Sequence, residues 1–200
     1  MYTLYFLPGA CSLATQVVLR ELNLPFELKN KNQVDHFREL NPLGTVPVLS
    51  AKEEVLTEGA AILIYLLEKH AGSMLPQAQP QRRQVIENLM FANATVHPAY
   101  GTLFFIKNTL AEGEAQTAAF RAAATRLEAI WQVVEDKLSV QYFLGGDEVS
   151  PVDILLTVYA GWGDYFPVDI NIGPKSRAMI ARVKQLPSYV ASVSAERDAS

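Results

Sequence analysis

The segment "PGACSLA", residues 8–14, places the only cysteine of this chain beside a serine, immediately after a proline and a glycine. A thiolate is a strong nucleophile, and a hydroxyl can donate a hydrogen bond to an anion. The apolar run before the turn, residues 2–7, predicts a buried strand, and the apolar spacing after it predicts a helix over 12–22. Cys11 is therefore expected at a helix N-terminus, where backbone N–H groups and the helix dipole make a thiol easy to ionise.

A second interpretation gives Cys11 no chemistry. A free cysteine is often a small buried hydrophobic residue that packs without reacting. As the only cysteine it cannot form an internal disulfide, so a reducing compartment, the cytoplasm, is the expected location. The local pattern leaves both interpretations open.

The first part of the chain, residues 1–76, alternates strand and helix signals and is expected to form one domain. Its expected elements are a strand at 2–7, a helix at 12–22, a strand at 24–29, a polar connection at 30–44, a hairpin from 45–50 to 54–58, and a helix at 58–72 that closes with Lys69, His70 and Gly72. This order predicts a mixed sheet covered by helices.

The rest of the chain shows no strand period. A proline- and glutamine-rich stretch predicts a linker at 77–83, and the long helical patterns beyond it predict an all-helical domain at 84–200. One helix start is marked by Ser150 as N-cap, Pro151 at the first position and Asp153 three residues after the cap, which predicts a capping box.

Composition excludes several classes of protein. The formal net charge is −4 and Lys and Arg do not cluster, which argues against a nucleic-acid surface. The longest apolar run, residues 60–67, is too short to cross a bilayer, and the N-terminus lacks a secretory pattern. The three histidines, His36, His70 and His97, are scattered, so we expect no metal site. A soluble intracellular protein is expected.

Four motifs occur in a characteristic order: "PGACS", "NPLGTVPVL", "TEGAAILIYL" and "SPVD". With them the chain resembles the cytosolic glutathione S-transferases, in particular the bacterial beta class, over nearly its whole length and more strongly in residues 1–75. The resemblance implies an α/β plus all-α fold, in which an N-terminal thioredoxin-like domain (β-α-β-α-β-β-α) binds glutathione and a C-terminal helical-bundle domain binds the co-substrate.

The resemblance also implies a glutathione site. Pro47 follows a cis peptide in this family, which turns the backbone of Val46 to pair with the cysteinyl part of glutathione as an added strand would. The helix start at Glu58 and Gly59 holds the γ-glutamyl carboxylate, and the Glu58 side chain pairs with the α-ammonium. The family usually has serine at the position of Gly59, so a hydroxyl contact is missing here. The alternatives are an ordinary edge-strand proline and a simple first-turn carboxylate.

Other positions match the family less closely. His97 corresponds to a histidine that faces the thiol in beta-class relatives, with Asn93 one turn earlier and Lys31 as a further basic candidate. A lone histidine is as often a satisfied core or surface residue. Pro98 should kink the helix that carries His97.

The catalytic group stays open between Cys11 and Ser12. Tyrosine-type transferases carry their Tyr at the position of Phe6, and Tyr5 lies on the other face of the expected strand. The beta-class cysteine lies against the glutathione sulfur and can form a mixed disulfide with it, whereas serine-type enzymes donate a hydroxyl hydrogen bond to the thiolate.

The activity implied is conjugation of glutathione, the co-substrate, to an apolar electrophile in a pocket with side chains such as Phe104, Phe105, Trp162 and Phe166. One alternative is thiol–disulfide exchange or deglutathionylation through Cys11. Another is a non-catalytic binding or regulatory protein of the same fold. A homodimer is expected, without nucleic acid, membrane or metal.

Overall fold

The computed structural model describes residues 1–52, 54–70 and 74–199. Contacts divide the chain into two compact units. Unit 1 comprises residues 1–82 and 184–200, and unit 2 comprises residues 83–183. Gly72, expected at the end of a helix, lies outside the described residues.

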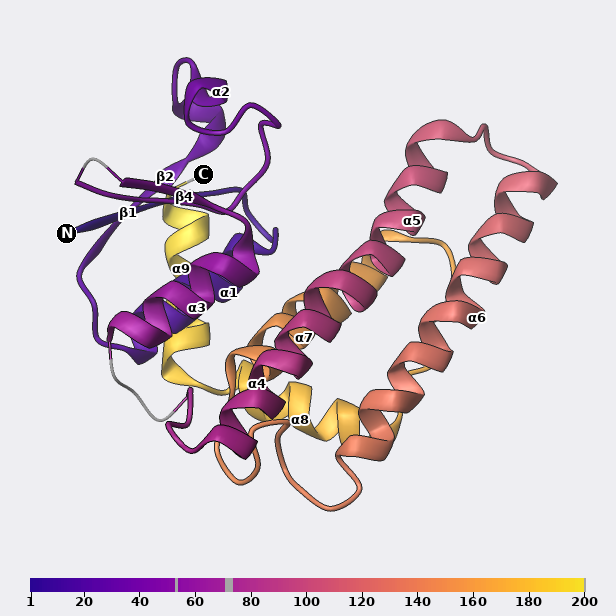
Figure 1. Cartoon of the computed structure of the whole chain (residues 1–200). Coiled ribbons are helices and arrows are strands. Elements are labelled where there is room, and N and C mark those ends of the chain that lie inside the picture. Colours follow the sequence, from indigo (N-terminus) through magenta and orange to yellow (C-terminus); the bar gives the residue numbers. More distant parts are fainter. Residues whose placement is uncertain (53, 71–73, 200) are drawn as a thin grey trace. The chain divides into compact units, whose positions relative to one another are not determined.

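Unit 1 is a four-stranded sheet with helices on both faces (Figure 1). Its elements are β1 (Tyr2–Phe6), α1 (Ser12–Glu21), β2 (Phe26–Asn30), the 3-10 turn η1 (Lys31–Gln33), α2 (Phe37–Leu40), β3 (Val48–Ala51), β4 (Glu54–Thr57), α3 (Gly59–Lys69) and α9 (Pro187–Asp198). The strand order is β2-β1-β3-β4, with β1 parallel to β2 and the other pairs antiparallel. This arrangement confirms the thioredoxin-like fold.

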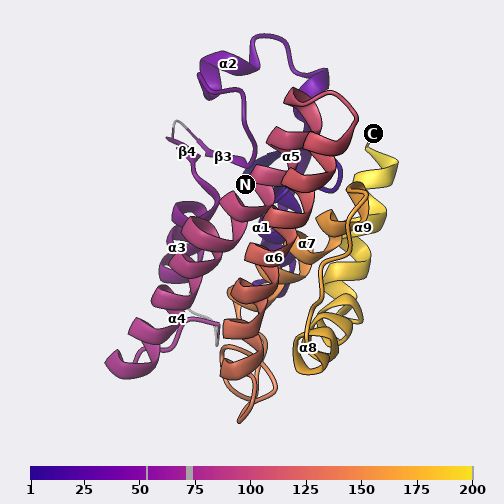
Figure 2. The ribbon, with the colours of Figure 1, turned by 90° about the vertical axis from the view of Figure 1, so that its right-hand side faces the viewer.

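The core of unit 1 follows from the alternation in β1. Tyr2, Leu4 and Phe6 are buried, whereas the alternate residues Thr3 and Tyr5 are only partly buried. Leu4 packs with Leu19 of α1, Leu49 of β3 and Ile62 of α3 in one hydrophobic cluster. Figures 1 and 2 show α1 and α3 on one face of the sheet and α2 on the other. The apolar faces of α1 and α3 thus pack in one cluster with Tyr2 and Leu4 of β1.

Helix α9 packs against α1 in unit 1. The Gly9 N–H donates to Glu196 Oε2 at 2.9 Å, and Arg20 Nε donates to Ser192 Oγ at 3.1 Å. The boundaries expected from the sequence place all of 84–200 in the helical domain, whereas the contacts group α9 with the sheet. These two polar contacts and the buried faces of both helices account for the difference.

Unit 2 is helical. The helices between residues 79 and 184 are α4 (Gln79–Phe91), the π-helical segment η2 (Ala92–Val96), α5 (His97–Thr109), α6 (Glu114–Lys137), α7 (Pro151–Gly161), the 3-10 turn η3 (Trp162–Tyr165) and α8 (Pro174–Lys184). Figures 1 and 2 show α5 and α6 side by side, and Trp131 Nε1 of α6 donates to the buried Tyr100 Oη of α5 at 3.0 Å. In the described residues, no helix is long and apolar enough to cross a membrane.

The helix that carries His97 is irregular where a proline interrupts it. The π-helical segment Ala92–Val96 precedes His97, and Pro98 is the second residue of α5. Proline has no N–H to donate to the preceding turn, and a π turn is one way in which a helix accommodates the missing bond. A π-helical segment therefore lies immediately before the position where the sequence predicts a kink.

The capping box at the start of α7 is confirmed. Asp153 Oδ2 accepts from the N–H and the hydroxyl of Ser150, and Asp153 Oδ1 accepts from the Leu144 N–H at 2.8 Å. Burial raises the pKa of Asp153, and these hydrogen bonds oppose that shift. One buried carboxyl group therefore satisfies donors from the helix start and from the preceding loop.

Candidate functional site

The turn between β1 and α1 presents the thiol of Cys11, which is the N-cap residue of α1. The thiol is partly buried, and Cys11 Sγ donates to the Val46 carbonyl oxygen at 3.2 Å. The fold thus brings Cys11 against the backbone segment immediately before β3. Two of the residues expected in the site from the sequence are in contact.

The expectation that Cys11 ionises easily is wrong for this structure. Burial raises the pKa of Cys11 to about 11, and the Glu58 carboxylate adds to this shift. The backbone N–H groups of Cys11 and Ser12 lower the pKa, as a helix start should, but they do not outweigh burial. Cys11 is therefore a neutral thiol at neutral pH and acts as a hydrogen-bond donor.

Ser12 is fully buried, unlike its neighbour. Its hydroxyl donates to the Leu7 carbonyl at 3.4 Å and accepts from the Leu7 N–H at the same distance. The hydroxyl is used within the turn, which gives Ser12 a structural role. This geometry favours Cys11 over Ser12 as the group that meets a ligand.

The start of α3 lies beside the Val46–Pro47 peptide, which is cis as expected. A Cβ atom on Gly59 would lie 3.5 Å from Pro47 Cγ, an ordinary van der Waals distance, so the two residues adjoin. Glu58 is exposed and has a φ of 69°, which is uncommon for a residue with a side chain. The first N–H groups of α3 lack acceptors within the helix, and such groups suit a carboxylate.

The last two residues of β1, Tyr5 and Phe6, are both aromatic. Phe6 is fully buried, and the ring of Tyr5 packs at 5.7 Å from that of Phe37. Lys31 donates to the Gly44 carbonyl at 2.6 Å, in the loop that leads to Val46. Lys31 thus braces this loop.

His97 lies in unit 2 within an aromatic cluster. Its ring is 5.2 Å from that of Tyr159 and 5.3 Å from that of Trp162, both edge to face. Asn93 lies in the π-helical segment just before it. His97 is therefore fixed by aromatic neighbours, in keeping with the alternative of a satisfied core residue.

The side chains expected in an electrophile pocket separate into two sets. The centre of the Phe104 ring lies 5.9 Å from that of Trp162 and 4.8 Å from that of Phe166, and both of these partner residues are buried. Phe105 is 63% exposed and does not join this cluster. Helix periodicity explains the split, because consecutive residues of a helix point in different directions.

The residues around Cys11 in unit 1 complement a peptide that carries a thiol and ends in a free α-ammonium and α-carboxylate. Val46 offers main-chain groups, Cys11 offers an S–H donor, and the start of α3 offers N–H groups beside the Glu58 carboxylate. These are the complements of a peptide backbone, a thiolate, a carboxylate and an ammonium. In the described part of the chain, no group of three or more His, Cys, Asp or Glu residues could hold a metal ion.

Sequence reasoning missed Glu196. This carboxyl group is buried and accepts a hydrogen bond from the Gly9 N–H, 187 positions earlier in the chain. Gly9 itself lies two positions before Cys11. Burial raises the pKa of Glu196 to about 7, and the Gly9 hydrogen bond opposes the shift. A lone Glu in a polar C-terminal helix carries no sequence signal for such a contact.

Comparisons with known proteins point to one family. The family model "Glutathione S-transferase, N-terminal domain" matches residues 12–74. Glutathione S-transferase GST-4.5 of Xanthomonas campestris is 33% identical over 175 residues, which cover 84% of this chain and 85% of that protein.

Two solved structures share the whole fold. A sphingomonad glutathione S-transferase complexed with glutathione is 30% identical, with a TM-score of 0.82 and 98% of each chain covered. The beta-class glutathione S-transferase of Sphingomonas chungbukensis is also 30% identical, with a TM-score of 0.82, 97% of this chain and 98% of that chain covered. The chain belongs to the glutathione S-transferase family.

Proposed function

We propose that this glutathione transferase binds glutathione along Val46 and the start of α3, and conjugates it to apolar electrophiles. The observation that carries this proposal is the Cys11 Sγ contact with the Val46 carbonyl at 3.2 Å. A peptide paired with Val46 as an added strand has its cysteinyl sulfur next to this thiol. Glu58 and the N–H groups that follow it then receive the γ-glutamyl end.

Bound glutathione supplies the attacking sulfur as a thiolate. Cys11, neutral because its pKa is about 11, donates its S–H hydrogen to that thiolate in place of the Val46 carbonyl. The backbone N–H groups of Cys11 and Ser12 add positive potential at the same place. The residues of the turn thus lower the pKa of the bound thiol and orient it.

Exchange chemistry through Cys11 is the second candidate. It needs the Cys11 thiolate as nucleophile, and a pKa of about 11 leaves roughly one molecule in ten thousand ionised at pH 7. Conjugation requires only a hydrogen-bond donor at this position. The raised pKa therefore favours conjugation over disulfide exchange.

The test compares Cys11→Ala with Cys11→Ser, which keeps a donor hydrogen. Cys11→Ala is expected to slow conjugation of 1-chloro-2,4-dinitrobenzene about tenfold, the scale of one hydrogen bond to an anion, and to raise the thiol pKa of bound glutathione. Cys11→Ser should retain most of the rate. Steady-state rates and the ultraviolet absorbance of the bound thiolate against pH give both quantities.

Ser12→Ala is the companion variant, and it should retain conjugation because the Ser12 hydroxyl bonds only to Leu7 among the contacts of the turn. Loss of conjugation in Ser12→Ala together with full activity in Cys11→Ala would make the enzyme serine-type. Rapid formation of a mixed disulfide on Cys11 at pH 7, seen as a gain of one glutathionyl mass, would favour exchange.

Gly59→Ser should strengthen glutathione binding. The new Cβ makes only ordinary contact with Pro47, and its hydroxyl adds one hydrogen bond to the γ-glutamyl carboxylate. We expect a Kd lower by roughly fivefold, which corresponds to about 1 kcal/mol. Calorimetric titration measures it, with Gly59→Ala as the matched control for the Cβ and the backbone. Equal affinity in the Ser and Ala variants would contradict this placement of the carboxylate.

The remaining features of the proposal concern partners and location. We propose an apolar electrophile because unit 2 is rich in aromatic side chains around Trp162. We propose that the chain forms a homodimer, as most soluble oligomers do. We also propose a cytoplasmic location, because a single working thiol is best kept in a reducing compartment.

A further inference from the structure

The residues that follow η3 in unit 2 have no regular secondary structure. The 3-10 turn ends at Tyr165, Phe166 is extended, and neither a helix nor a strand follows before α8. We call residues 165–173 the connecting segment. Because no helix or strand holds this segment, its place depends on contacts with neighbouring elements. One of these is the Glu128 carboxylate of α6, which accepts from the Asn171 N–H at 3.0 Å.

Lys107 of α5 contacts the first two residues of the connecting segment. Its Nζ donates to the Tyr165 carbonyl oxygen at 2.8 Å and lies 5.8 Å from the centre of the Phe166 ring, over which it is placed. The last carbonyl groups of a helical turn lack donors within that turn, and Lys107 supplies a donor from another helix. An ammonium over an aromatic ring is also attracted by the ring. One side chain of α5 therefore binds both the backbone and an aromatic side chain of this segment.

Both of these residues belong to the aromatic cluster of unit 2. The centre of the Phe166 ring lies 4.8 Å from that of Phe104, edge to face, and 6.0 Å from that of Phe120. The Tyr165 ring lies 6.3 Å from that of Phe104. Phe104 precedes Lys107 by three residues on α5, so the two side chains share one face of this helix. A connecting segment released by Lys107 would therefore take two rings away from Phe104.

We propose that Lys107 is a positioning residue for the apolar electrophile. This role rests on the proposed function, in which the electrophile packs on aromatic side chains of unit 2. Lys107 holds Tyr165 and Phe166 against Phe104, so the apolar surface that receives the electrophile is formed before the electrophile binds. Lys107 acts through these rings and takes no part in the chemical step.

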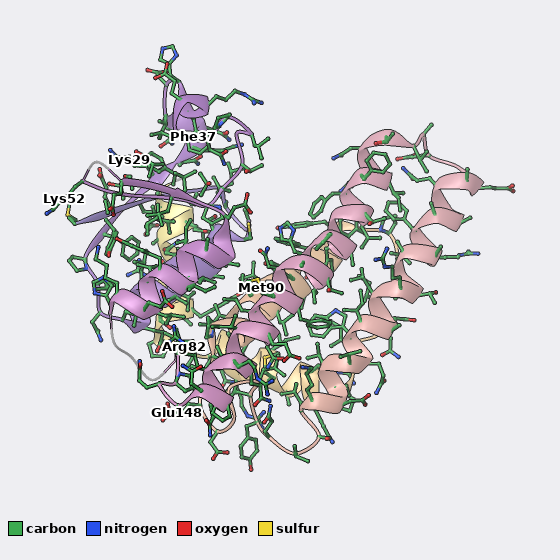
Figure 3. All side chains as sticks on the ribbon, in the orientation of Figure 1. Lys29, Phe37, Lys52, Arg82, Met90 and Glu148 are labelled. Atoms are coloured by element: carbon green, nitrogen blue, oxygen red, sulfur yellow. The ribbon has the colours of Figure 1, made fainter. Side chains whose placement is uncertain are left out.

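The other side of the aromatic cluster is held by regular helices. The centre of the Trp162 ring lies 6.0 Å from that of Tyr100 in α5 and 4.8 Å from that of Tyr159 in α7. Side chains occupy the space between α5 and α6 in Figure 3, where Met90 marks the preceding helix α4. Removing the exposed lysine should therefore loosen the connecting segment and leave the helices folded.

The test measures steady-state conjugation by the full chain with two electrophiles that share one reacting group, phenethyl isothiocyanate and methyl isothiocyanate. Lys107→Met keeps an apolar stem and removes the ammonium. In this variant KM for the phenethyl compound should rise about fivefold, the scale of one hydrogen bond. The value of kcat, KM for glutathione and KM for methyl isothiocyanate should stay as in the wild type, because a methyl group has little apolar surface to pack on the rings.

Two further variants separate positioning from a loss of charge. Lys107→Arg keeps a cation with N–H donors, so it should restore most of the affinity for the phenethyl compound. Arg126→Met is the matched control, because it removes an exposed cation from α6 of the same unit, and all its kinetic constants should equal those of the wild type.

Acrylamide quenching of tryptophan fluorescence examines the connecting segment without catalysis. Trp162 lies three residues before this segment and is 7% exposed, and Trp131 is fully buried. Quenching should therefore increase in Lys107→Met and stay at the wild-type level in Lys107→Arg and Arg126→Met.

Three results would overturn the inference: an unchanged KM for phenethyl isothiocyanate in Lys107→Met, an equal rise in KM for methyl isothiocyanate, or quenching that does not change. Failure of the proposed function is a different result, namely a wild type that conjugates neither electrophile. A wild type that conjugates both, with the same constants in Lys107→Met, contradicts the role of Lys107 alone.

Discussion

Asp153→Ala is expected to lower the free energy of unfolding of unit 2 by about 3 to 5 kcal/mol. The variant removes an acceptor for three donors: the N–H and the hydroxyl of Ser150, and the N–H of Leu144. All three lie in a buried region, so each loses a partner without gaining water. The start of α7 loses its capping box at the same time.

Asp153→Asn is the matched control for this variant. It keeps the shape and one carbonyl acceptor, so roughly half of the loss is expected. Both tryptophans, Trp131 and Trp162, lie in unit 2, so their fluorescence during urea unfolding reports on this unit alone. A loss of unfolding free energy below about 1 kcal/mol in Asp153→Ala would show that water can replace the hydrogen bonds of the capping box.

Glu196→Gln is expected to remove a pH dependence of stability. The pKa of Glu196 is about 7 in the folded chain against an ordinary 4.5, because the side chain is buried. The folded state therefore holds this proton more tightly than the unfolded state. The stabilisation is complete below pH 4.5 and is lost as the pH rises to about 7, by about 3 kcal/mol in all.

Glutamine stays neutral and keeps a carbonyl for the Gly9 N–H, so the variant should gain on the wild type across this window. The difference should approach about 3 kcal/mol near pH 8 and vanish near pH 4. Urea unfolding followed by far-UV circular dichroism measures it, and hydrogen exchange of α1 amides localises it to unit 1. Parallel stability curves for the two proteins would contradict the raised pKa.

The order of elements could be predicted from the sequence because each signal is local. The apolar run at residues 2–7 and the turn at Pro8 and Gly9 predict β1 and its end without reference to the rest of the chain. Ser150 and Asp153 likewise define the start of α7 by their spacing alone. Such features depend on a few neighbouring residues, and the structure confirms them.

The state of the thiol could not be predicted in the same way. The helix start favours the Cys11 thiolate, but burial has the larger effect on its pKa, and burial depends on how the whole unit packs around the turn. The sequence also leaves Ser12 and Cys11 as equal candidates, and they are distinguished by the contacts of Ser12 with Leu7 and of Cys11 with Val46. Local spacing thus indicates where a site is expected, whereas the protonation state of the thiol depends on residues distant in the sequence.

The hydrogen bond between Tyr2 and His70 shows the same limit. Tyr2 and His70 lie 68 positions apart, and neither forms a motif. His70, which in the sequence is simply the residue after Lys69 at the end of a helix, contacts the first strand only once the sheet has formed. Sites assembled from opposite ends of several elements leave no trace in residue spacing.

The packing of α9 on α1 makes unit 1 discontinuous along the chain. During translation, residues 83–183 leave the ribosome before α9 does. The face of α1 that α9 covers, together with the Gly9 N–H, meets its partners only when Pro187–Asp198 has left the ribosome. The unit that carries Cys11 is therefore the last of the two units to be completed.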